Sequence, residues 1–148
     1  MAQLTDAQQA VLLRIQELTA ELPGMPEFYK TCVRLMSVHA RKNADYTGTS
    51  GNPLFNFLWT AGFNHGSLKE AFRHHEGNKI ARLLSLDSAD EDAHNESVED
   101  TLDDLAIYVI LERAARDKCG AAFFEPVEPP SPLMPTGGFF TVELKRKE

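Results

Sequence analysis

Hydrophobic side chains recur every three or four residues through most of the chain, which is the period of one face of an α-helix. In the N-terminal segment Val11, Ile15 and Leu18 follow this spacing, and the sequence that starts at Thr5 is typical of a capping box. These signals predict a first helix over residues 5–22, which ends at a Pro-Gly pair.

Proline, glycine and polar runs divide the rest of the chain into further helices and loops. A second helix is predicted to start near Pro26 and to end near Asn43, before a turn-rich loop over residues 46–53. One or two short helices are predicted from residue 54, and a capping-box sequence at Ser67 opens the next helix. The remaining predicted elements are a helix over 67–86 with a weak point at Gly77, a polar loop over 87–95 and a last helix over 96–118.

Strand patterns are nearly absent from the chain. The expected fold class is therefore all-α, a compact helical bundle of about five helices. The bundle should occupy residues 1–124 as a helical, nucleotide-handling domain, and an extended, proline-rich C-terminal arm should occupy residues 125–148. We expect this arm either to be flexible or to dock on a partner subunit.

The composition is typical of a soluble protein that folds without disulfides. The chain has 148 residues, of which 43% are hydrophobic and 25% charged, and this length suits one domain with its own core. No apolar run is long enough to span a membrane, and the N-terminus lacks the pattern of a signal peptide. A cytoplasmic location without a membrane partner is expected, with Cys32 and Cys119 as buried thiols.

The formal net charge of −7 restricts the class of partner. Direct binding to nucleic acid is not expected, because contact with the phosphate backbone requires a basic face. A small phosphorylated ligand remains compatible with this charge, since divalent cations can bridge two negative partners.

The most informative pattern lies in the predicted helix over residues 96–118. Four aliphatic side chains from Val98 to Val109 form one apolar stripe at helical spacing, and carboxylates occupy the other side. The acidic side continues into Ile107 and Leu111 one turn later, so this side of the helix should also contact protein. The carboxylates are Glu96, Glu99, Asp100, Asp103 and Asp104.

Carboxylates that cluster at the edge of a packed bundle repel one another unless a cation lies among them. Glu96 and Asp100 are one helical turn apart and are candidate ligands for Mg²⁺, or for Mn²⁺, which accept oxygen ligands and share them with water and phosphate. Asp103 or Asp104 would extend this site. The competing interpretation is a solvated acidic face near a helix N-terminus, where the helix dipole favours carboxylates.

Basic residues of the helix over 67–86 offer a possible phosphate contact. Lys79 and Arg82 share a face, and they would either present two cations to a phosphate chain or form an ordinary solvated pair. A ferritin-like di-iron site is not supported, because the single Glu-x-x-His sequence at residues 91–94 falls in a predicted loop. No Walker-type loop occurs either.

Four sequence blocks, in this order, resemble one known family. They are Arg41-Lys42-Asn43-Ala44-Asp45-Tyr46, Asn52-Pro53-Leu54-Phe55-Asn56-Phe57, Asn78-Lys79-Ile80-Ala81-Arg82-Leu83, and Glu96-Ser97 followed by Asp100 to Tyr108. Together they resemble the nucleotide modification associated domain 1 type family of phages and prophages, which is similar to the broader MazG-like all-α nucleotide pyrophosphohydrolases. The resemblance implies an oligomeric bundle that binds Mg²⁺ through acidic residues on two helices. It also implies cleavage of a nucleoside triphosphate to monophosphate and pyrophosphate, in the host cytoplasm if a phage encodes the chain.

The resemblance also implies roles for individual residues. Asp45 would be the acid beside the glycine-rich loop, and Asn56 would line the nucleotide pocket. The expected catalytic residues are Asp45, Asp103 and Lys79, the expected substrate-binding residues are Asn56, Lys79 and Arg82, and the expected metal ligands are Glu96, Asp100 and Asp104.

The expected function is a Mg²⁺-dependent (deoxy)nucleoside triphosphate pyrophosphohydrolase that acts as a homodimer or homotetramer. The chain departs from the family pattern in two respects: it has no Glu-Glu-x-x-Glu run, and Asn78 stands where the phage family usually has Asp. The alternative function is therefore a non-catalytic module that binds or sequesters a nucleotide. A structural bundle with a solvated acidic face is the third possibility.

Overall fold

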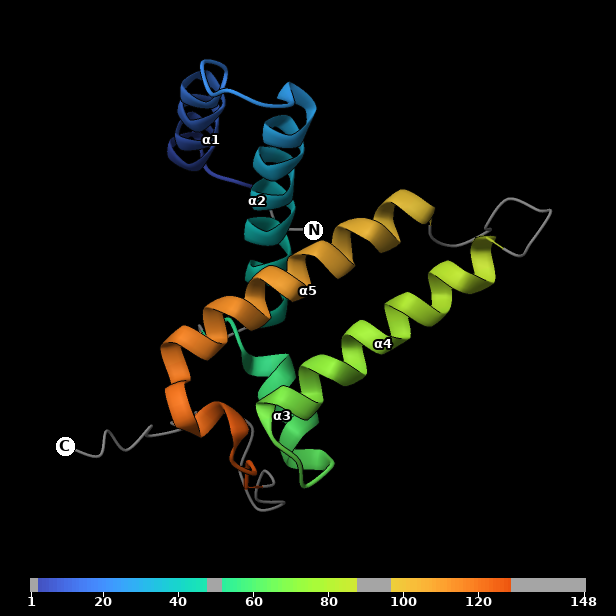
Figure 1. The fold of residues 1–148 in the computed structure, drawn as a ribbon. Coiled ribbons are helices and arrows are strands. Elements are labelled where there is room, and N and C mark those ends of the chain that lie inside the picture. The colour runs from blue at the N-terminus through green and yellow to red at the C-terminus, as the bar shows by residue number, and fades with distance from the viewer. Residues whose placement is uncertain (1–2, 48–51, 88–96, 129–148) are drawn as a thin grey trace. The chain divides into compact units, whose positions relative to one another are not determined.

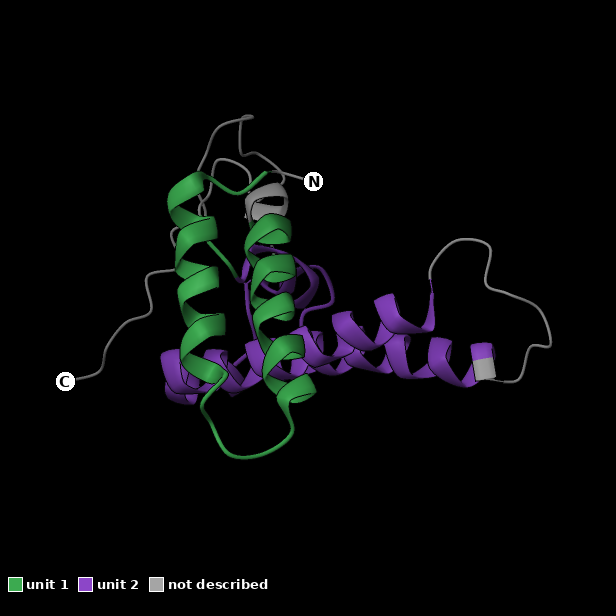
Figure 2. Ribbon diagram, turned by 90° about the horizontal axis from the view of Figure 1, so that it is seen from above, with its two compact units in different colours: residues 1–53 green, residues 54–148 purple. Residues whose placement is uncertain are grey.

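The computed structural model describes residues 3–47, 52–87 and 97–128, and within these ranges the chain is all-α (Figure 1). Five α-helices and one short 3₁₀ helix follow one another, without a strand in the described ranges. The chain divides into two compact units, residues 1–53 and 54–148 (Figure 2). The predicted fold class is confirmed. The acidic loop, the residues from 129 onward and the side chain of Asp45 lie outside the description.

The first unit is a pair of neighbouring helices, α1 (Asp6–Thr19) and α2 (Pro26–Thr47) (Figure 2). The predicted capping box of α1 is confirmed, because the Gln8 N–H donates to Thr5 Oγ1 and the Thr5 N–H donates to Gln8 Oε1. The helix ends three residues before the predicted Leu22. The predicted loop start at residue 46 was wrong, because α2 continues to Thr47 and the first glycine follows only at position 48.

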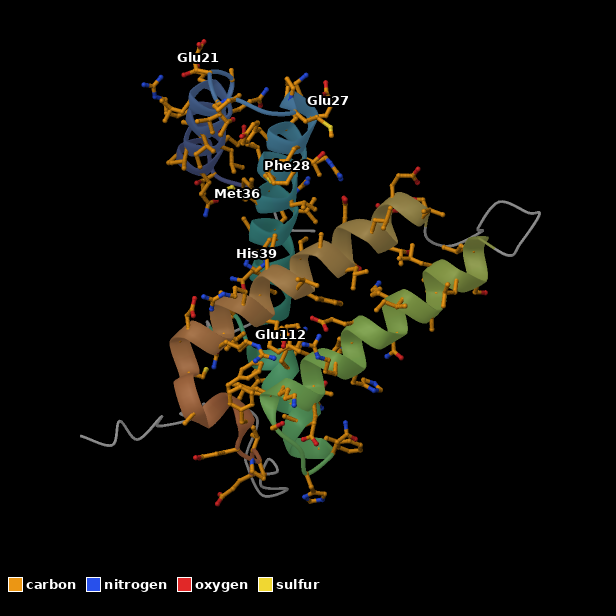
Figure 3. The ribbon with its side chains drawn as sticks, viewed as in Figure 1. Glu21, Glu27, Phe28, Met36, His39 and Glu112 are labelled. Carbon is orange, nitrogen blue, oxygen red and sulfur yellow. The ribbon has the colours of Figure 1, made fainter. Side chains whose placement is uncertain are left out.

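Hydrophobic side chains of the first unit are largely exposed. No residue of α1 is buried, although its apolar positions have helical spacing. On α2 the exposed Phe28 and Met36 contrast with the buried Val33 and Leu35 (Figure 3). Helical periodicity therefore predicted both helices, but it did not predict how much of their apolar surface is covered.

The second unit contains α3 (Phe55–Phe63), α4 (Leu68–Asp87), α5 (Val98–Cys119) and the 3₁₀ helix η1 (Gly120–Phe124). A single helix forms where one or two were expected, and Gly77 does not interrupt α4. The capping box of α4 is confirmed by a hydrogen bond of 2.7 Å from the Ser67 N–H to Glu70 Oε2. The predicted start of the last helix at Glu96 was wrong by two residues, because the Ser97 side chain caps the helix by accepting from the Asp100 N–H.

Aromatic packing among α3, α4 and η1 forms the core of this unit. The rings of Phe57 and Phe72 stack at 3.9 Å between centroids, and Phe72 and Phe123 are fully buried. The chain after η1 returns to the start of α4, where the Val127 N–H donates to the Gly66 carbonyl at 2.8 Å. The first residues of the predicted C-terminal arm thus pack on their own chain.

The helices α4 and α5 lie side by side (Figure 1), and this packing decides which face of α5 is covered. The acidic side of α5 is covered from Asp104 onward, since Asp104 and Ile107 are buried. The predicted contact of this side with protein is therefore confirmed. By contrast, Leu102 and Val109 of the other apolar stripe are 49% and 51% exposed.

Candidate functional site

A charged pair joins α4 to α5. The Nζ atom of Lys79 lies 2.7 Å from Oδ2 of Asp104, and the two side chains are only 18% and 10% exposed. Lys79 reaches this position because it follows the buried Phe72 and Glu76 on the α5-facing side of α4. Partial removal from water makes this ion pair stronger than one on an open surface.

The predicted carboxylates occupy different environments along the first turns of α5. Asp100 is exposed in the first turn, Asp103 is half-buried, and Asp104 is buried against α4. Glu96 lies outside the described residues, so its distance from Asp100 is not defined. The structure thus brings Asp104 and Lys79 together and leaves Asp100 open to solvent.

The remaining predicted site residues lie on α2, α3 and α4. Arg82 is half-buried one turn after Lys79 on α4, and Asn56 is half-buried in the first turn of α3. Asp45 belongs to the last turns of α2, without a described side chain. Among the side chains that are described, no three His, Cys, Asp or Glu residues gather closely enough to hold a metal ion.

A second charged cluster, which the sequence analysis did not identify, lies further along the same two helices. Glu76 on α4 and Glu112 on α5 are 4% and 5% exposed, which is rare for carboxyl groups. The signal in the sequence was spacing: Glu76 follows Arg73 by one turn, and Glu112 has Arg116 one turn later. Their burial depends on α4 and α5 packing together.

Two arginines hold this cluster together. Arg73 contacts both carboxyl groups, with Nη1 at 2.5 Å from Glu76 Oε2 and Nη2 at 3.1 Å from Glu112 Oε1. Arg116 binds Glu112 Oε1 through Nε at 3.0 Å and through Nη2 at 2.5 Å. Each helix therefore supplies one arginine and one glutamate, and the contact from Arg73 to Glu112 crosses between them.

The two carboxyl groups differ in proton affinity. Burial raises the pKa of Glu76, and a hydrogen bond to Glu112 together with the charge of that residue raises it further. Burial acts in the same direction on Glu112, but hydrogen bonds from Arg116 and Glu76 and the charge of Arg73 outweigh it, so the pKa of Glu112 is lowered. Of the two carboxyl groups, Glu76 therefore has the higher affinity for a proton.

An aromatic cluster lies beside these charges. His75 Nε2 is 3.1 Å from Thr60 Oγ1, and its ring contacts Phe57 and Tyr108 edge to face. Burial, followed by the charges of His74 and Lys79, lowers the pKa of His75. A neutral imidazole thus helps to join α3, α4 and α5.

These features define a class: an all-α protein in which two neighbouring helices carry a line of charged side chains that are partly or fully withdrawn from water. Comparison with protein-family models, curated proteins and solved structures finds no match to the chain. In the part of the chain that the structure describes, no helix is both long and apolar enough to cross a membrane.

Proposed function

We propose that the chain binds a (deoxy)nucleoside triphosphate with Mg²⁺ at the exposed edge of the α4–α5 pair and hydrolyses it to monophosphate and pyrophosphate. The observation that carries this proposal is the partly buried ion pair between Lys79 and Asp104, at 2.7 Å. It places a cation suited to phosphate and a carboxylate suited to Mg²⁺ at one point between two helices.

The basic residues of α4 would bind the phosphate chain. Lys79 and Arg82 lie one turn apart, and both are half-buried, which strengthens their attraction to an anion. When phosphate oxygens approach, Lys79 would exchange part of its contact with Asp104 for a contact with the phosphate. Asp104 would then be available as a ligand.

The described carboxylates suit Mg²⁺ better than a metal that needs a full set of protein ligands. In nucleotide sites Mg²⁺ is commonly held by one or two carboxylates, and water and phosphate complete its shell. Asp100 and Asp104, one turn apart on α5, would supply these carboxylates, together with Glu96. The bound ion would neutralise the charge that develops on the phosphate oxygens. Asp103, half-buried beside them, would orient the attacking water, a role for which Asp45 is the second candidate.

Two further considerations support a nucleotide as the ligand. The net charge of −7 disfavours an anionic ligand unless a cation accompanies it, so the binding should depend on Mg²⁺. The four sequence blocks that resemble the phage family include Lys79, Arg82, Asp100 and Asp104, and a MazG-like activity is part of this proposal. Asn56 would contact the nucleoside.

A non-catalytic nucleotide-binding module is the second candidate. Two observations favour it. Lys79 already neutralises the charge of Asp104. The chain also lacks a Glu-Glu-x-x-Glu run. Such a module would bind the nucleotide with Mg²⁺ and release it unchanged.

The test combines turnover with calorimetry. Purified protein is incubated with Mg²⁺ and each of the nucleoside and deoxynucleoside triphosphates, and monophosphate and pyrophosphate are measured. The informative variant is Asp100→Asn, because this exposed side chain contributes little to folding. Asp117→Asn is the matched control, an exposed carboxylate on the same helix that pairs with Arg113.

The proposal expects product from at least one nucleotide, a large loss in Asp100→Asn and no loss in Asp117→Asn. Mg²⁺-dependent binding without product would support the module. If neither product nor binding is found with any nucleotide, both functions are wrong.

Assembly as a homodimer or homotetramer is also part of the proposal. Leu102 and Val109 on α5, and Ile80 and Leu84 on α4, are each about half exposed or more. Exposed apolar side chains at helical spacing on each of two adjacent helices support a contact with a second copy of the chain.

A further inference from the structure

Glu76 and Glu112 lie close to each other across the contact between α4 and α5, where Arg73 pairs with both of them. Both carboxyl groups are withdrawn from water, and Arg73 touches both of them. Such a pair of acids is costly when both are ionised, because like charges repel strongly where water does not screen them.

The hydrogen bonds around the pair are unequal. Oε1 of Glu112 accepts from Arg73 and from two nitrogen atoms of Arg116, so this carboxyl group is well stabilised as an anion. Glu76 accepts from Arg73 only through Oε2, and its Oε1 atom is fully buried without a hydrogen-bond donor among the described residues. A proton on Glu76 removes this deficit, because a carboxylic acid can donate to the Glu112 carboxylate.

Charge balance alone does not require this proton. The charged groups that act on Glu76 are Arg73 on its own helix and Glu112 on α5, and Arg116 pairs with Glu112, so that two arginines balance two ionised glutamates. The sequences of α3 and η1, which also pack against α4, contain no ionisable side chain. The geometry favours the proton: on one side Oε1 of Glu76 is buried without a donor among the described residues, and on the other side Oε1 of Glu112 already accepts from two arginines.

We propose that Glu76 and Glu112 form a carboxyl–carboxylate pair that holds one proton and fastens α4 to α5, so that the two helices pack less firmly once the proton leaves. The Glu76–Glu112 pair is thus a pH-sensitive contact between the two helices, which we call the latch. It is independent of nucleotide binding.

The direction of the effect follows from proton linkage. Because Glu76 binds its proton more tightly in the folded chain, its contribution to stability is complete below the ordinary glutamate pKa of 4.5 and is lost as the pH rises through its raised pKa. Glu112 has the opposite pH dependence. Because its pKa is lowered in the folded chain, the stability that it contributes is present above 4.5 and is lost as the pH falls through its lowered pKa. The pair therefore stabilises the fold most near pH 4.5, the ordinary glutamate pKa, and less as the pH rises toward the raised pKa of Glu76.

The first test compares the pH dependence of unfolding in the wild type and in Glu76→Gln, which keeps a donor for Glu112 but cannot lose a proton. Glu125→Gln, at an exposed position of the same unit, is the control. Between the ordinary glutamate pKa of 4.5 and the raised pKa of Glu76, the ratio of wild-type to variant folding constants should fall by up to about tenfold per pH unit, as expected for one proton, and it should level off above the raised pKa. Parallel curves for the wild type and Glu76→Gln would overturn the proposal.

A second measurement does not depend on the variant being folded. Wild-type protein with carbon-13-labelled glutamate carboxyl groups is titrated by NMR. One glutamate carboxyl should remain protonated at a pH where the other glutamates are ionised. If all glutamates ionise together in the folded protein, the pair holds no proton and the latch does not exist.

Discussion

The ammonium group of Lys79 lies 2.7 Å from Oδ2 of Asp104, and this contact joins the basic side of α4 to the acidic side of α5. A further charged contact between these helices is that of Arg73 with Glu112. Both contacts depend on the register of α4 against α5. A change that shifts this register should therefore affect both.

Removal of the Asp104 carboxylate should destabilise the fold. Asp104→Asn leaves Lys79 partly buried without its anionic partner, and the expected loss is about 1–3 kcal/mol in the free energy of unfolding. Asp117→Asn, which breaks an exposed pair with Arg113, should cost less than about 1 kcal/mol. Urea unfolding measures both values, and equal losses would show that partial burial adds nothing to the Lys79–Asp104 pair.

The aromatic core should depend on Phe72 more than on any exposed aromatic residue. Phe72 is fully buried and stacks on Phe57, so Phe72→Ala should cost about 3–5 kcal/mol through lost burial and the cavity that it leaves. Phe63 is 70% exposed, and Phe63→Ala should change the free energy of unfolding by less than about 0.5 kcal/mol. Thermal or urea unfolding of both variants would contradict the described core if Phe63→Ala proved the more damaging.

The start of α4 depends on Ser67 and on its reciprocal contact with Glu70. Ser67→Ala removes both hydrogen bonds of the Ser67 hydroxyl, the one it donates to Glu70 Oε2 and the one it accepts from the Glu70 N–H, and should cost about 1 kcal/mol. The backbone N–H of Ser67 and then its hydroxyl lower the pKa of Glu70, so the stability that Glu70 contributes is present above the ordinary value of 4.5 and is lost as the pH falls through its lowered pKa. NMR titration should show the Glu70 pKa rise in Ser67→Ala. An unchanged Glu70 titration would mean that the hydroxyl contact is absent in solution.

His75 should resist protonation in the folded chain. Burial lowers its pKa, so its contribution to stability is complete above the ordinary histidine value of 6.5 and is lost as the pH falls below it. Ring-proton NMR should show His75 titrating below 6.5. In Thr60→Val the hydrogen bond to the ring is lost while the shape is kept, and this loss should weaken α3–α4 packing. A His75 pKa at or above the ordinary value would contradict its described surroundings.

Exposed apolar side chains give a test of assembly. If α4 and α5 contact a second copy of the chain, replacement of Leu102 and Val109 by glutamate should lower the molar mass measured by light scattering to that of a monomer. Glutamate at Phe124, which is 54% exposed on η1, is the matched control and should leave the mass unchanged. A wild type that is already monomeric would contradict the proposed assembly.

Local sequence accounts for the start of each well-capped helix. The capping residues Thr5 and Ser67 were recognisable, because a cap joins side chains and backbone groups only three residues apart. Errors arose where the signal was weaker. The end of α2 was placed too early, since a polar run without glycine or proline is compatible with continued helix.

The acidic residues of the last helix were identified as a candidate site from sequence, but their separate environments were not. The continuation of the acidic side into Ile107 and Leu111 correctly predicted contact with protein. Whether Asp100 or Asp104 would be covered depended on the rotation of α5 about its axis. Apolar residues on two sides of this helix leave that rotation undetermined in one sequence.

The sequence by itself determined the all-α class, the order of the helices and their caps, because these follow from contacts within a few residues. Tertiary structure alone decided that α4 is the helix against which the acidic side of α5 packs, and that Leu102 and Val109 stay exposed. It also decided that Lys79 finds Asp104 and that Glu76 finds Glu112. These partners belong to different helices, and their meeting depends on a helix–helix register that the packing of side chains such as Ile107 and Ala115 selects.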